Sequence, residues 1–172
     1  MKKSSIFWVA IIAIVIFSVA WVSVRANSSE LLSTLINSGS NNYVQLHEYS
    51  SDLQVALAEK EKDKKLEYAL VALSKATDAR EGIEFLGPIF QSEGIDSTFL
   101  RDRINMMVIN TRHYIMEIGN HGDSISEDLT KKLKKDMQDA QFITKTLNHE
   151  WILQKDFEKV KNAILTLSKE IG

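Results

Sequence analysis

The chain opens with an uninterrupted apolar run that differs from every later segment. Residues 6–24 contain no charged side chain, and only Ser18 and Ser23 are polar. A helix of this length covers roughly 28 Å, close to the ~30 Å hydrocarbon core of a bilayer. The run is apolar on all sides rather than along one stripe, which is untypical of a helix in a soluble core. We therefore expect residues 1–26 to be a transmembrane signal-anchor that contacts the lipid bilayer through residues 6–24.

The charges that flank this run predict its orientation. Lys2 and Lys3 precede it, whereas only Arg25 follows closely. Basic residues favour the cytoplasmic side, and aromatic side chains such as Trp8 and Trp21 favour the two interfaces. The sequence thus predicts a single-pass protein of a bacterial cell membrane, with a cytoplasmic N-terminus and an extracytoplasmic C-terminal domain.

A cleaved signal peptide is the alternative interpretation. A basic start, an apolar centre and cleavage after Ala26 would release a secreted protein. Against cleavage, the apolar run exceeds the ~7–15 residues of a typical signal peptide, and the bulky Trp21 and the charged Arg25 lie where small neutral residues are usual. We favour the retained anchor.

After the apolar run, residues 27–42 are rich in Ser and Asn. Residues 30–36 are compatible with two helical turns, but Ser38-Gly39-Ser40-Asn41-Asn42 interrupts the pattern. We expect a juxtamembrane linker that contains a short helix.

Helical periodicity governs the remaining segment, 43–172, for which we expect an all-α, antiparallel bundle of three to four long amphipathic helices. The first is expected over 43–86 as one helix, with a break near 60–64 as the alternative and Gly87-Pro88 as its end. Its apolar series contains Leu46, Tyr49, Leu53, Leu57, Leu66, Leu70, Leu73, Ala76 or Thr77, and Ile83, with Arg80 in phase.

Two or three further helices are expected C-terminal to this one. Asp96 or Ser97 is a candidate N-cap for a helix over 97–118, and Ser124-Ile125-Ser126-Glu127 fits a capping box for a helix over 125–148. The apolar pattern slips around 148–154, so one helix or two fit residues 125–171, and the last series predicts a helix over 152–171. The two C-terminal series are Leu129, Leu133, Met137, Ala140 and Ile143, then Phe157, Val160, Ile164, Leu167 and Ile171.

Composition and charge limit the classes of partner that the chain is expected to bind. Without the three basic residues that flank the apolar run, the rest of the chain has 18 basic against 23 acidic residues, or about −5. A mildly acidic domain is a poor candidate for nucleic-acid binding. The Lys-rich run 131–135 is interspersed with Asp128, Asp136 and Asp139, so we interpret it as a solvated helix face. The chain has no Cys, which excludes disulfides and cysteine zinc sites.

Two constellations are candidate sites. His113, Glu117 and His121 recur at four-residue steps, a spacing that suits a two-His, one-carboxylate metal site, but Gly119 and Gly122 are expected to break the helix first. We therefore expect no metal there.

The second constellation surrounds Gly87-Pro88. Phe85, Leu86, Ile89 and Phe90 are candidate partner-binding residues, although capping of the bundle core is the expected role of such a cluster.

The expected function follows from the placement and architecture of the chain. We expect a membrane-anchored interaction protein that senses, scaffolds or modulates a partner in the cell envelope, without catalysis or a cofactor. No GxSxG, GxGxxG or HExxH motif occurs. The alternatives are a secreted helical protein and a metal-dependent site around His113. The sequence leaves the oligomeric state open.

Overall fold

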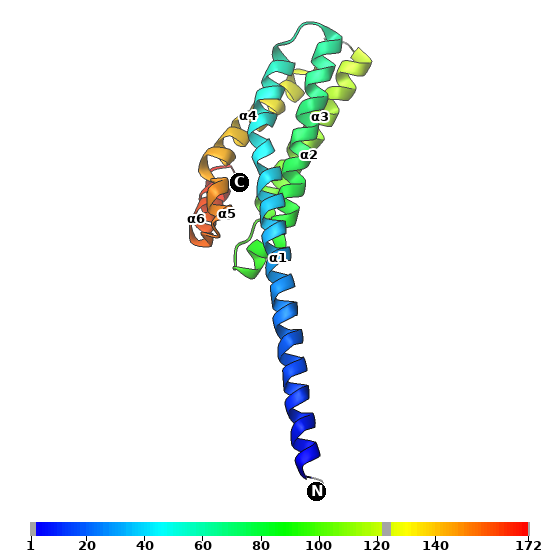
Figure 1. The fold of residues 1–172 in the computed structure, drawn as a ribbon. Helices are drawn as coiled ribbons and strands as arrows, with labels where there is room; N and C mark the ends of the chain where they lie inside the picture. Colours follow the sequence, from blue (N-terminus) through cyan, green and yellow to red (C-terminus); the bar gives the residue numbers. More distant parts are fainter. Residues whose placement is uncertain (1–2, 122–124, 172) are drawn as a thin grey trace. The chain divides into compact units, whose positions relative to one another are not determined.

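The chain folds into helices joined by short connections (Figure 1). The computed structural model describes residues 3–121 and 125–171, with side chains from residue 28 onward except at position 121. No strand occurs in these ranges, which confirms the all-α class. The helices are α1 (Lys3–Ala58), α2 (Lys62–Ser92), α3 (Thr98–His121), α4 (Glu127–Thr146), α5 (His149–Leu153) and α6 (Phe157–Glu170).

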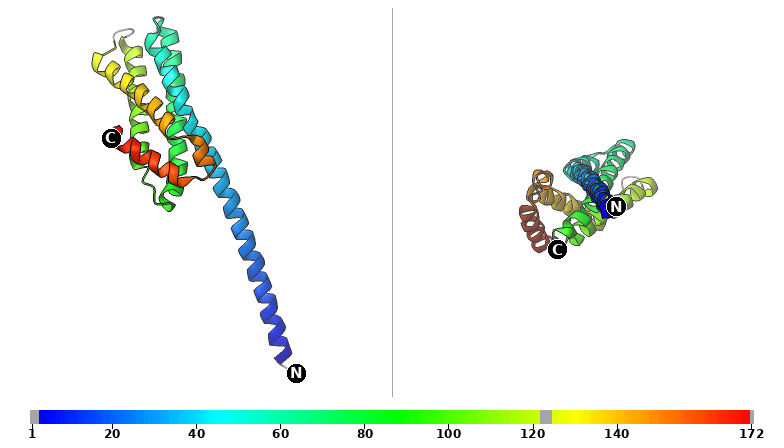
Figure 2. Two further views of the ribbon diagram at one scale, coloured as in Figure 1. Left: turned by 90° about the vertical axis from the view of Figure 1, so that its left-hand side faces the viewer. Right: turned by 60° about the horizontal axis from the view of Figure 1, so that its bottom comes forward.

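The chain divides into two units, residues 1–35 and residues 36–172. The second unit is the helical bundle. Within it, the C-terminal part of α1 forms a hairpin with α2, and α3 runs back alongside α2 (Figures 1 and 2). α4 packs on α3, and α6 contacts both α3 and α4.

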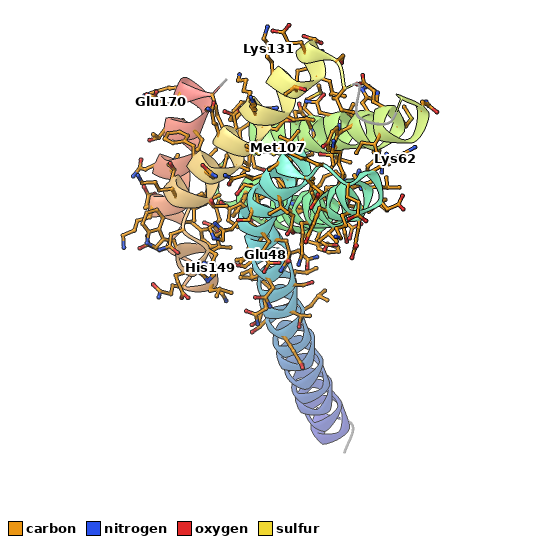
Figure 3. All side chains as sticks on the ribbon, turned by 90° about the horizontal axis from the view of Figure 1, so that it is seen from above. Glu48, Lys62, Met107, Lys131, His149 and Glu170 are labelled. Atoms are coloured by element: carbon orange, nitrogen blue, oxygen red, sulfur yellow. The ribbon has the colours of Figure 1, made fainter. Side chains whose placement is uncertain are left out.

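Large apolar side chains from five helices fill the centre of this bundle. Met107 of α3 is fully buried and lies among the helices in Figure 3, whereas Lys62, Lys131 and Glu170 lie at the periphery. The core includes Leu46 and Leu53 from α1, Ile83 and Leu86 from α2, Ile104 from α3, Leu133 and Ile143 from α4, and Ile164 and Leu167 from α6.

The first unit contains the predicted membrane segment. Within the described residues, no helix is long and apolar enough to cross a bilayer. The predicted segment 6–24 lies outside the residues whose side chains are described.

The expected linker over 27–42 is wrong, because α1 continues through it. Ile36, Ser40 and Tyr43 are buried at three- and four-residue steps, in phase with Leu46. Gly39 lies on the same side and faces Gly82 and Leu86 of α2. Tertiary packing therefore offsets the weak helix propensity of Ser, Gly and Asn.

The single helix expected over 43–86 is interrupted at 59–61, close to the alternative break. The carboxylate of Glu59 accepts hydrogen bonds from the backbone N–H groups of Lys60 (2.7 Å) and Glu61 (3.0 Å). The charged residues 59–61 thus form the turn of the α1–α2 hairpin although they are good helix formers. The Glu59 carboxylate satisfies backbone N–H groups that have lost their helical partners.

Pro88 does not end α2, contrary to expectation, since the helix continues to Ser92. An internal proline costs about 3 kcal/mol in an isolated helix, but Leu86 and Phe90 on either side of it are fully buried. Gly94, two residues after the last helical residue, terminates the helix with a φ of 68°. There Ile95 N–H donates to Phe90 O (2.8 Å) and Gly94 N–H donates to Gln91 O (3.1 Å), the bond pattern of a Schellman cap.

The buried face of α2 differs from the predicted one. The helix buries an alanine stripe, and Gly82 and Ile83 extend it. Leu70 of the predicted leucine stripe is 50% exposed. Small residues let α1 and α2 approach closely, so the alanine stripe faces the core and part of the leucine stripe turns outward. The stripe consists of Ala69, Ala72, Ala76 and Ala79.

The C-terminal segment contains three helices rather than one or two, and each begins with a side-chain cap. Ser126 caps α4 through Leu129 N–H, Asn148 caps α5 through Glu150 N–H, and Asp156 caps α6 through Lys159 N–H. The helix expected over 152–171 begins only at residue 157, since Lys155 adopts a φ of 58° that no α-helix continues through. α4 covers 127–146 of the expected 125–148.

Candidate functional site

Of the predicted metal site, the structure describes the side chains of His113 and Glu117. Glu117 of α3 accepts hydrogen bonds from the backbone N–H (2.8 Å) and the hydroxyl (3.0 Å) of Ser126. Its carboxylate thus fixes the start of α4. His113 is exposed beside a cleft of about 260 Å³, and the side chain of His121 lies outside the described residues. Among the side chains that the structure describes, no group of three His, Asp or Glu residues gathers to hold a metal.

Glu117 supplies the capping partner that the sequence pattern assigned to Glu127. α3 continues past Gly119 to His121, which brings Glu117 beside the N-terminus of α4. A carboxylate is favourable there because it complements the positive end of the helix dipole.

The predicted docking cluster is mostly part of the core. Leu86 and Phe90 are fully buried and Ile89 is 6% exposed, whereas Phe85 is 43% exposed. Only Phe85 is available to a partner in this fold.

A buried ion-pair network joins α3 to α4, and sequence analysis missed it. Arg103 donates to Asp139 (2.6 Å) and to Asp136 (2.7 Å). Asn110 donates its amide to the other oxygen of Asp136 (2.8 Å). Arg103 is 13% exposed, and the two aspartates are buried. Asp136 and Asp139 therefore belong to the interior and not to a solvated face.

The position of Asp136 carries the signal that could have revealed this network. Five of the six buried residues of α4, all except Asp139, recur at alternating four- and three-residue steps, and Asp136 lies in that series between Leu133 and Ala140. Met137, which the sequence analysis placed in the core, is only half-buried. A carboxylate at a core position of an amphipathic helix predicts a buried partner.

Burial governs the protonation of this network. Desolvation raises the pKa of Asp136 above its ordinary value, although Asn110 and Arg103 partly offset the effect. Burial acts to lower the pKa of Arg103, but the two carboxylates more than compensate and raise it. The arginine is therefore permanently charged, and it needs both partners.

A second polar contact lies next to this network. Tyr49 of α1 shares a hydrogen bond with Thr111 of α3 at 3.3 Å. Burial, followed by the charge of Asp136, raises the pKa of Tyr49. A polar layer thus crosses the bundle from α1 through α3 to α4. The Tyr49–Thr111 bond joins α1 to α3, and the ion-pair network separately joins α3 to α4; paired buried polar groups of this kind favour one register of the helices.

Two larger clefts mark the surface of the bundle. One, of about 520 Å³, lies between the end of α2 and the start of α3, beside Pro88, Gly94 and Arg101. The other, of about 450 Å³, lies between α1 and α4 beside His47 and Lys145. Behind the second cleft the hydroxyl of Tyr43 donates to Leu147 O (2.9 Å), which joins α1 to the end of α4.

The solvent side of α2 exposes three large apolar side chains. Leu70, Val71 and Phe85 are exposed by 50%, 40% and 43%. Carboxylates lie among them. We define the outward face of α2 as Glu67, Leu70, Val71, Ser74, Asp78, Glu81 and Phe85.

A comparison of the chain with protein-family models, with curated proteins and with solved structures found no match.

Proposed function

We propose that this chain is a single-pass membrane protein whose helical bundle lies outside the cytoplasm and binds another envelope protein through the outward face of α2. One structural observation carries the interaction, namely the large apolar side chains on the solvent side of a helix whose core side is built from alanines. One sequence observation carries the anchor, namely the charge-free run 6–24 behind Lys2 and Lys3.

The positions of the exposed apolar side chains on α2 support binding. Single exposed apolar residues are ordinary on a protein surface. Here Leu70, Val71 and Phe85 share one side of one helix, and each exposes 40% or more of its surface. Leu70 and Val71 are adjacent, and Phe85 lies about 21 Å further along the same side. Large apolar side chains aligned on one helix face in this way suit a partner that extends along the helix.

The close packing of α1 on α2 explains why these side chains are left out of the core. Gly39 and Gly82 bring the two helices together, and Leu86 of α2 packs against Gly39. Leu70 lies outside this contact, and a partner that covers it would gain the free energy of its burial.

In-cell photo-crosslinking of the full-length chain tests the proposal. A photo-reactive amino acid at Leu70 should give a crosslinked product in the membrane fraction, whereas the same group at Lys131, whose side chain is 72% exposed on α4, should not. Val71→Asp should remove the Leu70 product without changing the melting temperature, because Val71 is on the surface.

Two results would contradict the proposal. Absence of any Leu70 product from membranes that contain the protein would reject the interaction. Recovery of the protein from the culture medium with a mature N-terminus after Ala26 would reject the anchor.

A further inference from the structure

We infer that the partner presents an amphipathic helix whose exposed flanks are basic, and that this helix lies along the outward face of α2. The inference rests on the proposed function, since it names the chemistry of the partner for the same surface. It is carried by the geometry of the face and by its unbalanced charge.

The outward face is a continuous seam. Its members recur at alternating four- and three-residue steps from Glu67 to Phe85, with Leu70 beside them. This is the spacing of one side of an α-helix, and it suits a second helix packed lengthwise. The seam is about 27 Å long at roughly 1.5 Å per residue. A partner helix of about 18 residues would cover it. The members in step are Glu67, Val71, Ser74, Asp78, Glu81 and Phe85.

The seam itself is negative, because it carries three carboxylates and no basic side chain. Glu67 and Glu81 are exposed, and neither forms a salt bridge with a described residue. Asp78 adds a third, half-buried carboxylate.

The cations of α2 lie outside the seam: Lys62, Lys64 and Lys65 are in its first turn, and Lys75 and Arg80 lie further along. Lys75 and Arg80 each have a carboxylate outside the seam close by. Lys75 pairs with Glu48 of α1, and Arg80 lies 3.5 Å from the carboxylate of Glu84. Lys64 and Lys75 interact electrostatically with Glu67 and Asp78, but their salt bridges are with Glu61 and Glu48, so the seam carboxylates can still pair with a basic partner.

The apolar and acidic side chains of the outward face together define the chemistry of a complementary partner. Leu70, Val71 and Phe85 require apolar side chains opposite them, and the carboxylates beside them favour Lys or Arg on the flanks. An anionic lipid surface would be repelled by the same carboxylates, so the membrane itself is a poor occupant of this face.

A peptide-binding measurement tests the inference. The full-length chain is held in phosphatidylcholine nanodiscs, and empty nanodiscs give the background. The probe is an 18-residue helical peptide with leucines at three- and four-residue steps and lysines elsewhere. The matched probe has glutamate at every lysine position. We expect the lysine peptide to bind, and the glutamate peptide to bind at least roughly tenfold more weakly. Higher salt should weaken binding of the lysine peptide.

Charge reversal locates the binding site. Glu67→Lys with Glu81→Lys should reduce affinity for the lysine peptide roughly tenfold or more. The control is Glu158→Lys with Glu170→Lys, two exposed positions on α6 that change the net charge equally. Equal losses in both variants would show diffuse attraction and overturn the inference, as would equal binding of the two peptides or no binding of either.

Photo-crosslinking at Leu70 separates this failure from failure of the proposed function. If the cellular product forms and survives Glu67→Lys with Glu81→Lys, the face binds a partner of other chemistry, and only the inference fails. If no product forms with the native chain, the proposed function fails as well.

Discussion

Gly82 of α2 lies against the backbone of α1 at Gly39. A Cβ atom at Gly82 would stand 2.6 Å from the carbonyl oxygen of Gly39 and 2.6 Å from the backbone nitrogen of Tyr43. Both obstacles are backbone atoms, so no side-chain rotation relieves them. The distance between α1 and α2 therefore depends on this pair of glycines.

Gly82→Ala should destabilise the bundle by about 1–3 kcal/mol, because the helices must separate to admit one methyl group. Urea unfolding followed by circular dichroism measures the change. Gly119→Ala is the control: a Cβ atom there meets nothing within 4 Å, and alanine improves helix propensity. Equal stability of Gly82→Ala and the native chain would show that α1 and α2 do not pack as described.

Removal of one partner from the buried network should be costly. Asp136→Ala leaves the guanidinium of Arg103 with one carboxylate, and it should lower the free energy of unfolding by about 3 kcal/mol. Asp128→Ala, at an exposed ion pair with Lys132, should change it by less than about 1 kcal/mol. Chemical denaturation of both variants decides the matter, and similar effects would place Asp136 on the surface.

The pKa values of Asp136 and Asp156 should be shifted in opposite directions from the ordinary aspartate value of 3.8. Burial raises the pKa of Asp136, whereas hydrogen bonds from Lys159 lower the pKa of Asp156. Carbon-13 NMR of the side-chain carboxyls measures both. A pKa for Asp136 below that of Asp156 would contradict the burial of the network.

The same shifts set the sign of the pH dependence of stability. The folded chain binds the Asp136 proton more tightly than the unfolded chain does, so this group adds stability below pH 3.8 and loses it as pH rises through its raised pKa. Asp156 adds stability above pH 3.8 and loses it as pH falls through its lowered pKa. Relative to Asp136→Asn, the native chain should therefore lose stability on raising the pH. An unchanged difference across the acidic range would refute this.

Phe85 and Phe90 should respond differently to truncation. Phe90→Ala removes a fully buried ring and should lower stability by about 3–5 kcal/mol. Phe85→Ala removes a ring that is 43% exposed and should cost far less, while it weakens crosslinking at Leu70. Thermal melting separates the two variants, and similar losses would mean that Phe85 also packs in the core.

Local signals predicted the parts of the fold that depend on local physics. Asp96 accepts a hydrogen bond from Thr98 N–H at the start of α3, as the sequence suggested. A serine caps α4, although it is Ser126 and not the first serine of the predicted capping box. The apolar stripe of α6 is likewise predictable, since Val160, Ile164 and Leu167 are all buried.

The features that sequence analysis missed depend on contacts between distant segments. Hydropathy favoured the leucine stripe of α2, but the close approach at Gly39 and Gly82 selects the alanine stripe. Gly and Ser also suggested a linker before residue 43, although the same close approach holds that segment helical. Of the four residues in the predicted docking cluster, only Phe85 is exposed.

The anchor and the orientation of the bundle are the centre of this account, and the Cys-free sequence offers a direct measurement. Single cysteines at Lys3 and Lys131 are exposed in turn to a membrane-impermeant maleimide, applied to intact spheroplasts and to lysed ones. The account predicts that Lys131→Cys is labelled in intact spheroplasts and remains with the membrane after alkaline carbonate extraction, while Lys3→Cys is labelled only after lysis. Labelling of Lys131→Cys only after lysis would contradict it.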